Sequence, residues 1–404
     1  MRTTMFKLPR LSLSKTRKRS GGEFLVLDLG SHSVKALFCT VVSSSQVSIT
    51  RSLEVETPPG SIVYGRIREP EVLREKLRGA LDGVALPVVV GISGEAIFGF
   101  STVGRSNRAR PEKPLGEKEL AAAVKRIEES AFVDAVSRAA AVDGNPEVEL
   151  ELVNAALTSA KADGYFIADP SGYKGQVVEM SYYTAFARSE DLVQIQKLFA
   201  SLDLEILAVS GVLHPLTKVL TPEKLSGFNA LLVDIGGQTT EVAIIFGGGI
   251  VGTKTLDIGG YHLSLFMAQS MGISLEAAEQ KKLAYSQGAL SEEEGSQVRD
   301  LLRKPVSWWI SGLQTALSEF EGVKTFPDRF LLGGGGAALL DLQSRVSQHL
   351  WGRYLPFRSE PRPEVLNVSQ LGLVQELPPE LAGPGWVPTV SLATCGLEIL
   401  GEKH

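Results

Sequence analysis

The chain of 404 residues contains 44% hydrophobic residues, enough to bury a large core, and we expect two or more domains. Its net charge of −5 gives no nucleic-acid footprint, and its two cysteines exclude a disulfide framework and a cysteine metal cluster, as is typical of a reducing cytoplasm. The longest apolar runs are far shorter than the ~20 residues that a helix needs to cross a bilayer.

The first 22 residues form an electrostatic unit of their own. Seven basic side chains precede the first acidic residue, Glu23, and five large apolar side chains lie between them. The basic residues are Arg2, Lys7, Arg10, Lys15, Arg17, Lys18 and Arg19, and the apolar ones are Met5, Phe6, Leu8, Leu11 and Leu13. The segment is either a disordered, solvated tail or a peripheral contact with an anionic membrane surface, to which each cation contributes ~1 kcal/mol.

Residues 24–39, FLVLDLGSHSVKALFC, predict a β-hairpin with the carboxylate of Asp28 at the end of its first strand. The turn and the second strand hold Gly30, Ser31, Ser33 and Lys35. We then expect a strand at 47–53, a helix at 69–81 and a strand at 88–92. This order of elements is that of the first part of an α/β domain.

A small α+β unit interrupts this domain. A polar, basic loop at 104–114 leads to a long amphipathic helix at 117–142, which begins with acidic residues and ends before Asp143 and Gly144. Strand-like segments at 148–153 and 154–160 follow, and the passage DPSGYKG at 169–175 leads into a strand at 176–186. A helix at 191–202, a strand at 204–210 and a segment at 210–220 return the chain to the first domain.

Residues 228–252 repeat the pattern of the first hairpin. Apolar runs at 230–233 and 242–246 enclose Asp234, Gly236, Gly237, Thr239 and Thr240. Aligning Asp28 on Asp234 places Gly30 on Gly236, Ser33 on Thr239 and Val34 on Thr240. One Asp-x-Gly turn can be an ordinary hairpin. Two of them predict similar domains that face each other across a nucleotide, because such a turn offers backbone N–H groups, hydroxyls and a carboxylate that holds Mg²⁺ through water.

The second half continues with a TLDIGG passage at 255–260, which we interpret as a strand-to-helix turn. Helices are expected at 261–271, 275–285, 306–320, 337–347 and 389–400, a strand at 330–332, and an irregular, proline-rich segment at 351–385. Four glycines at 333–336 favour a close approach of the backbone to a ligand. Trp308 and Trp309 are interpreted as core or interface residues.

The paired turns resemble the phosphate loops of the actin-like ATPase superfamily. The inserted unit and its DPSGYKG passage resemble the FtsA and PilM branch, and FtsA, a bacterial cell-division protein, more than PilM, a type IV pilus assembly protein. The resemblance covers most of residues 23–400 and implies a duplicated, ribonuclease H-like α/β fold with an inserted α+β subdomain. The implied segments are a basic tail (1–22), a first actin-like domain (23–100 and 181–227), the insertion (101–180), a second actin-like domain (228–385) and a C-terminal helix that returns to the first domain (386–404).

The resemblance also implies a site for ATP and Mg²⁺. Asp28 and Asp234 would hold Mg²⁺ through water, and the phosphates would meet Gly30, Ser31, Ser33, Lys35, Gly236, Gly237, Thr239 and Thr240. The adenosine would lie against Glu279, Lys282, Gly334 and Gly335, although Glu279 and Lys282 also fit a solvated helix face. In segment 210–220, where related hydrolases carry a Gln or Glu that positions water, this chain offers His214, which either orients water or is a helix-face residue. We therefore expect tight ATP binding with slow or negligible hydrolysis, and the catalytic residues stay unknown.

Three functions follow from these observations. An FtsA-like adaptor would self-assemble with ATP and link a filament protein such as the tubulin-like FtsZ to the inner face of the cell membrane. A PilM-like assembly factor would bind a cytoplasmic peptide of a membrane protein. A small-molecule kinase is disfavoured, because segment 210–220 has no Asp or Glu to act as a base. FtsA-like chains usually end in an amphipathic membrane-binding helix, so direct attachment of this chain to a membrane would require residues 1–20 to take the place of that helix.

Overall fold

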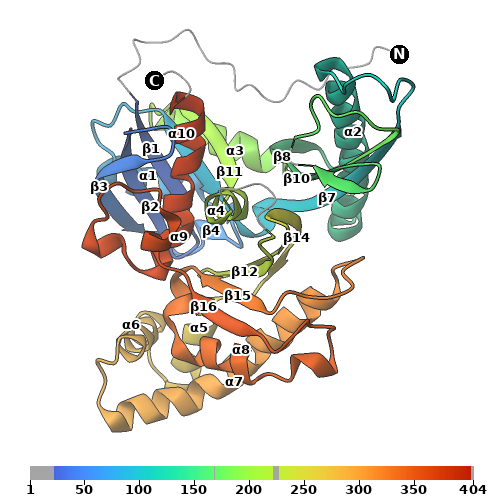
Figure 1. The fold of residues 1–404 in the computed structure, drawn as a ribbon. Coiled ribbons are helices and arrows are strands. Elements are labelled where there is room, and N and C mark those ends of the chain that lie inside the picture. Colours follow the sequence, from blue (N-terminus) through green and yellow to red (C-terminus); the bar gives the residue numbers. More distant parts are fainter. Residues whose placement is uncertain (1–21, 168, 222–226, 402–404) are drawn as a thin grey trace.

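The computed structural model describes residues 22–167, 169–221 and 227–401, which form two α/β domains and a smaller unit beside the first (Figure 1). Apart from Gly22, the predicted basic segment lies outside these residues, and so do 402–404. In the described part of the chain, every helix is too short or too polar to cross a bilayer.

The first domain is built on a five-stranded sheet in the order β11-β6-β1-β2-β3. The strands are β1 (Glu23–Leu29), β2 (Ser33–Val41), β3 (Val47–Glu56), β6 (Val88–Ile92) and β11 (Ile206–Gly211), with a separate small hairpin of β4 (Ile62–Val63) and β5 (Arg66–Ile67). The helices are α1 (Pro70–Ala80), α3 (Ser189–Ser201), α4 (Leu213–Leu220), α9 (Val387–Ser391) and α10 (Ala393–Gly401). The chain therefore returns to this domain at its C-terminal end, although the predicted single helix at 389–400 is two helices, since α9 ends at Ser391 and α10 begins at Ala393.

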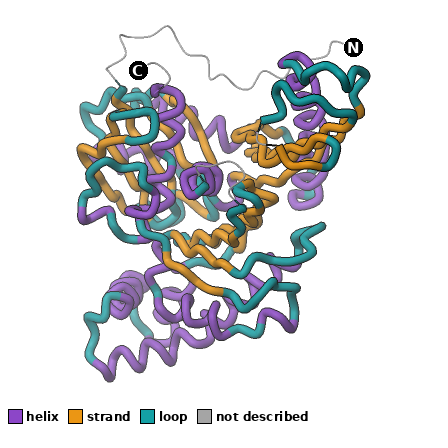
Figure 2. The backbone as a smooth tube through the Cα atoms, viewed as in Figure 1, coloured by secondary structure: helices purple, strands orange, loops and turns teal. Residues whose placement is uncertain are grey.

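The second domain lies below the first in Figures 1 and 2, with its helices on the far side of its strands. Its strands are β12 (Ala230–Ile235), β13 (Thr240–Phe246), β14 (Gly249–Leu256), β15 (Arg329–Gly333) and β16 (Arg362–Val365). Its helices are α5 (Gly260–Met271), α6 (Leu275–Ser286), α7 (Glu292–Ser318) and α8 (Leu340–Gln348), with 3-10 turns η2 (Gly335–Ala338) and η3 (Trp351–Arg353). The 3-10 turns η4 (Val368–Leu371) and η5 (Pro379–Leu381) pack on the core of the first domain, and η6 (Pro384–Trp386) follows them.

Strand β12 explains why its sequence is a continuous apolar run. Ala230 and Leu232 belong to the core shared with the first domain, whereas Leu231 and Val233 belong to the core under helices α5, α7 and α8. Successive side chains of a strand point to opposite faces, so a strand covered on both faces needs an apolar residue at every position.

Helix α7 is longer than predicted. Its N-terminus at Glu292 is capped by Ser291, whose hydroxyl accepts from the Glu294 N–H, and three glutamates fill its first turn. Pro305 lies inside the helix and is buried. Proline usually ends or kinks a helix, which is why the sequence pattern predicted a start at residue 306.

The inserted unit packs helix α2 (Glu117–Asp143) against strands β7 (Ile97–Asn107), β8 (Leu150–Ala162), β9 (Tyr165–Ile167) and β10 (Val177–Arg188). Its strands continue the second domain's sheet, in the order β16-β15-β12-β13-β14-β7-β10-β8-β9, because Gly252 of β14 pairs with Phe100 of β7. The two strand-like segments predicted at 148–160 are one strand, β8. The domain limits at residues 100 and 180 stay predictions, and both fall inside strands.

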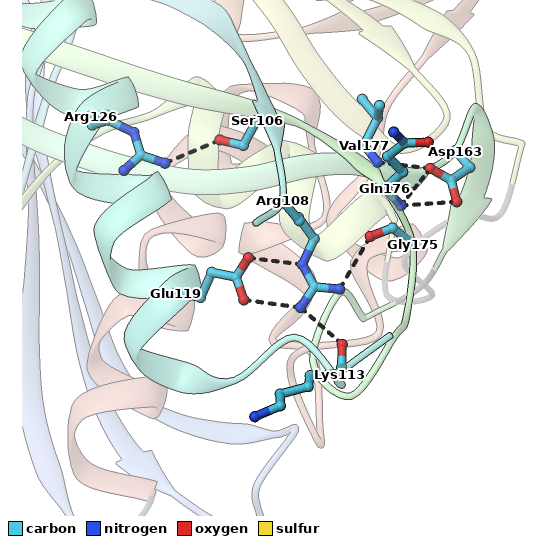
Figure 3. Close-up of polar contacts among 9 residues, drawn as sticks. All are labelled: Ser106, Arg108, Lys113, Glu119, Arg126, Asp163, Gly175, Gln176 and Val177. Carbon is cyan, nitrogen blue, oxygen red and sulfur yellow. Dashed lines mark hydrogen bonds and ion pairs between the residues drawn. The ribbon is translucent and has the colours of Figure 1, made fainter. Parts of the chain in front are cut away.

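A buried arginine closes the inserted unit at the start of α2 (Figure 3). Arg108 donates to both carboxylate oxygens of Glu119, at 2.8 and 3.0 Å, and to the carbonyl oxygens of Lys113 and Gly175. Nearby, the carboxylate of Asp163 accepts from the backbone N–H groups that begin β10. These contacts neutralise the arginine and fix the loops on either side of α2.

Candidate functional site

A cavity of about 520 Å³ lies between the two domains, and it is lined by both predicted phosphate turns. In the first hairpin, Asp28 of β1 pairs opposite Lys35 of β2, and in the second, Asp234 of β12 pairs opposite Glu241 of β13. The two turns are similar, since a Cβ on Gly30 would lie 2.5 Å from the Ser33 carbonyl oxygen and one on Gly236 would lie 3.1 Å from that of Thr239. A side chain would overlap the backbone at Gly30 and would be tightly packed at Gly236.

The structure places all but one of the predicted site residues on this cavity. The lining includes Asp28, Gly30, Ser31, Ser33, Lys35, Asp234, Gly236, Gly237, Thr239, Glu279, Lys282, Gly334 and Gly335. The two turns also touch each other, because the Gln238 N–H donates to the Ser31 hydroxyl at 3.1 Å and the Gln238 side chain accepts from the Tyr64 N–H at 2.8 Å. The domains therefore meet at the turns themselves.

Thr240 is the exception. It is fully buried, its hydroxyl donates to the Ile258 carbonyl oxygen at 2.7 Å, and it accepts from the Trp309 indole N–H at 3.0 Å. These contacts give it a place in the second domain's core rather than on the cavity. The internal alignment carried a signal for this, because Thr240 aligns with Val34, an apolar residue that is buried in the first domain.

Buried carboxylates dominate the electrostatics of the cleft. Burial and the charge of Asp28, opposed by Lys35, together raise the pKa of Asp234 to about 7. Burial also raises the pKa of Asp28, against the Thr389 hydroxyl and Lys35, which lower it. The Asp234 Oδ1 atom has no hydrogen-bond partner in the described part of the chain. An unpartnered buried oxygen beside a second carboxylate fits a cation or its water ligands.

Glu241 is a buried acidic residue beside Asp234 that does not line the cavity and that the sequence analysis missed. It is fully buried behind Asp234, and burial, followed by the charge of Asp234, raises its pKa well above the ordinary value. The Gly94 backbone N–H, at the turn that leads into β7, donates to its carboxyl group. Its position in the sequence, seven residues after Asp234, was available, but the strand register that brings the two side chains together was not.

The predicted adenosine residues are held in place by polar contacts. The Lys282 ammonium donates to Glu279 Oε2 at 2.9 Å and to the Gly260 carbonyl oxygen at 2.8 Å, and Glu279 also accepts from the Ser264 hydroxyl. Burial lowers the pKa of Lys282, against the attraction of Glu279. Both residues line the cavity, so the helix face that carries them is not simply solvated.

Two glycine-rich segments approach the second turn closely. Gly334 has a φ of +80°, and a Cβ there would lie 2.3 Å from Asp234 Oδ1, so glycine is required. The TLDIGG passage is a strand-to-helix turn, but it also supports the site, because the Gly260 and Tyr261 N–H groups donate to the carbonyl oxygens of Gly236 and Gly237 at 3.0 and 2.7 Å. The C-terminal Pro384, Gly385 and Trp386 line the cavity as well and were not predicted.

His214 does not line this cavity. It is buried on α4, its ring stacks on Tyr183 at 5.9 Å between centroids, and it lines a second cavity of about 850 Å³. Burial and the charge of Lys218 together lower its pKa to about 4, so the imidazole is neutral at pH 7. Of its two predicted roles, this environment favours the structural one.

The second cavity lies where the inserted unit meets both domains. Its walls include residues 155–160 of β8, the glycine turn at 247–249, and parts of α4 and α10. Strand β9 pairs only with Ala160, Lys161 and Ala162, so the edge of β8 before residue 160 has no strand partner among the described elements. An open edge of this kind can accept an extended peptide.

Comparison with known proteins gives one family and several relatives. Residues 231–360 match the family model of the cell division protein FtsA. FtsA of Helicobacter pylori strain J99 is 23% identical over 133 residues, which cover 32% of this chain and 26% of that protein. The ethanolamine utilization protein EutJ of Escherichia coli K12 is 42% identical over 81 residues, which cover 20% of this chain and 28% of that protein. The chain thus spans about a quarter of the length of these two relatives.

A solved structure matches nearly the whole chain. A chain of the PilM-PilN type IV pilus biogenesis complex superposes with a TM-score of 0.66 at 20% identity, covering 94% of this chain and 99% of its own. At this identity the likeness shows the fold. The predicted duplicated, actin-like α/β fold with an inserted α+β unit is confirmed.

Proposed function

We propose that this chain, which matches the FtsA family model over residues 231–360 and shares the fold of a PilM chain, binds ATP and Mg²⁺ between its domains and works as an assembly adaptor. The observation that carries the proposal is the cavity lined by both turns, in which the buried carboxylates of Asp28 and Asp234 lie near the ammonium group of Lys35. A small-molecule kinase is less well supported, because segment 210–220 brings no carboxylate to this cavity.

The residues of the cavity fit the proposed ligand. Mg²⁺ would neutralise charge on the triphosphate, and its water ligands would be held by Asp28 and Asp234, whose unpartnered Oδ1 is otherwise buried without compensation. Hydroxyls and backbone N–H groups of the two turns, together with Lys35, would donate to the phosphates. Glu279, Lys282, Gly334 and Gly335 would hold the adenosine. Slow or negligible hydrolysis is part of the proposal, since His214 lies in the other cavity.

Titration of labelled ATP, with and without Mg²⁺, tests this part of the proposal. Asp234→Ala should abolish Mg²⁺-dependent binding, because it removes an anchor for the metal and leaves the triphosphate charge uncompensated. Asp300→Ala is the matched control, since Asp300 is an exposed carboxylate on α7 paired with Arg303. Equal ATP affinity in the wild type and both variants would contradict the assignment of the site.

The second cavity favours a PilM-like role. We propose that a short cytoplasmic segment of a membrane protein lies there as an extended strand along residues 155–160 of β8. Support comes from the open edge of β8 and from the whole-chain likeness to a protein whose structure was solved as a complex with PilN. The other candidate is an FtsA-like division adaptor that self-assembles and binds an FtsZ-like protein, favoured by the family match at residues 231–360.

A photo-crosslinker at Ser159, on the wall of the second cavity, distinguishes these two candidates. In the native cell it should capture the cytoplasmic segment of a membrane protein, whereas the same crosslinker at Asp300 should not. Capture of an FtsZ-like protein at Ser159 would favour the division role instead. Filament formation with ATP, followed by electron microscopy, would test self-assembly.

We also propose that the protein is cytoplasmic and peripheral at the inner face of the membrane, held by residues 1–20. Seven cations and five apolar side chains would give weak binding per monomer, and assembly would make it multivalent. Flotation with anionic liposomes should depend on these residues and weaken with salt. A chain without residues 1–20 that floats as well as the intact one would rule out this tether.

A further inference from the structure

The ammonium group of Lys35 is held by a segment from the other end of the chain. Lys35 Nζ donates to the Gly385 carbonyl oxygen and lies 5.3 Å from the centre of the Trp386 ring. Both partners belong to η6, which precedes the helix α9 that crosses back to the first domain. A cation that donates to a carbonyl oxygen and lies over an aromatic face has two attractive partners, each of which restricts its position.

The same segment is fixed to the second domain. The Gly334 N–H donates to the Pro384 carbonyl oxygen at 3.1 Å. A Cβ on Gly385 would lie 3.3 Å from Lys35 Nζ and 3.5 Å from Gly335 Cα, so this residue lies between the first hairpin and the glycine loop of the second domain. The position of Trp386 is therefore determined from both sides of the cavity.

The charge of Lys35 acts on the centre of the cleft. It lowers the pKa of Asp28, its register partner, and that of Asp234 on the opposite domain. A cation that influences both carboxylates is placed where the phosphate chain of a nucleotide would lie. Its exact position decides how strongly it attracts that chain.

We propose that Trp386 is a positioning residue, which holds Lys35 toward the phosphate chain of the nucleotide and so favours ligands with more phosphates. The inference rests on the proposed ATP site and adds a C-terminal wall to it. Trp386 is half-buried and lines the cavity, yet its ring packs on the cation of the first hairpin. Its effect should grow with the number of phosphates, whereas stacking on the base would act equally on adenosine.

The test measures the affinities of ATP, ADP, AMP and adenosine for the full-length chain and its variants. Trp386→Leu should weaken ATP roughly tenfold, the size of a partly desolvated cation–π contact, weaken ADP less and leave adenosine within about twofold. Trp386→Phe, which keeps an aromatic face, should retain most of the wild-type ATP affinity. Circular dichroism checks the folding of each variant, and Trp386→Met replaces the leucine variant if that does not fold.

The second variant in this affinity experiment is Lys35→Met. It should reproduce the phosphate-graded loss, and Trp386→Leu added to it should weaken ATP no further, because the two residues act as one unit. Equal losses for ATP and adenosine, or fully additive losses in the double variant, would overturn the inference while leaving the ATP site intact. A wild-type chain that binds none of the four ligands would instead overturn the proposed function.

Discussion

Thr389 donates its hydroxyl to Asp28 Oδ2 at 2.7 Å, across 361 positions of sequence. Thr389 is fully buried on α9, and its hydrogen bond lowers the pKa of Asp28 against the larger effect of burial. Four residues earlier, Gly385 accepts from Lys35. One short stretch of the C-terminal segment therefore fixes both charged residues of the first hairpin.

Thr389→Val should weaken both the fold and the site. It removes the donor and leaves a buried carboxylate oxygen without a partner, which costs about 1–3 kcal/mol of the free energy of unfolding. Thr389→Ser keeps the hydroxyl and should lose less than half as much. Urea denaturation measures the stabilities, and ATP titration should show weaker Mg²⁺-dependent binding in the valine variant only. Equal stability of the valine and serine variants would contradict the role of this hydrogen bond.

Asp234→Asn should have opposite effects on stability and on ligand binding. The amide removes a buried charge beside Asp28 and Glu241, so we expect the ligand-free protein to gain about 1–3 kcal/mol in the free energy of unfolding. It also removes the charge that would anchor Mg²⁺, so binding of ATP with Mg²⁺ should be lost. Thermal unfolding without ligand gives the first result, and Asp300→Asn, an exposed change, should alter neither property. A less stable asparagine variant would contradict this account of the cleft electrostatics.

Thr239 and Thr240 are neighbours in sequence, but replacing each by valine should have different effects on stability and on ATP affinity. Thr240→Val removes the hydroxyl that bonds Trp309 and the Ile258 carbonyl oxygen, so it should cost about 1–3 kcal/mol of stability and leave ATP affinity within about twofold. Thr239→Val removes a hydroxyl on the cavity, so it should weaken ATP about fivefold with little effect on stability. Parallel denaturation and ATP titrations would separate them, and the reverse pattern would show that the two roles are exchanged.

The sequence predicted the parts of the site that depend on the pattern of neighbouring residues. Asp28 and Asp234 stand out because each lies near the end of an apolar strand, two residues before the glycine of a tight turn. One such turn could be an ordinary hairpin, and the second copy made a nucleotide site the better interpretation. The alignment of the two copies also indicated that Thr240 is a core residue, because it aligns with the apolar Val34.

The contacts that the sequence did not predict are long-range ones. Gly385 and Trp386 reach Lys35 across about 350 positions, and no local pattern marks a tryptophan after a Pro-Gly turn as a partner of a lysine in the first hairpin. The position of Glu241 beside Asp234 depends on the pairing register of β12 and β13, which the sequence did not predict. Asn154 interrupted the expected strand pattern at 148–160 because its amide bonds Ser210 and Gly211 at the end of β11, a tertiary contact. The buried Pro305 is tolerated inside α7 for the same kind of reason, since packing outweighs local propensity.

His214 makes the stability of the fold depend on pH below neutrality. Its imidazole is buried against Tyr183, so burial lowers its pKa to about 4, and the neighbouring Lys218 adds repulsion against the protonated form. In the unfolded chain the pKa returns to about 6.5. Between these two values the unfolded state binds a proton that the folded state does not bind, so the free energy of unfolding falls as the pH is lowered from 6.5 to 4.

His214→Phe should remove this contribution while keeping a ring against Tyr183. From the two pKa values, the wild-type protein should lose about 2 kcal/mol more stability than the variant between pH 7 and pH 5. Urea denaturation of both proteins at the two pH values gives this difference, and carboxylates that titrate elsewhere cancel because both proteins share them. His349→Phe is the control, since His349 is less buried and its pKa is lowered less strongly. If the wild type and His214→Phe lose the same stability on acidification, His214 is not buried as a neutral imidazole, and its place in the second cavity must differ from the one described.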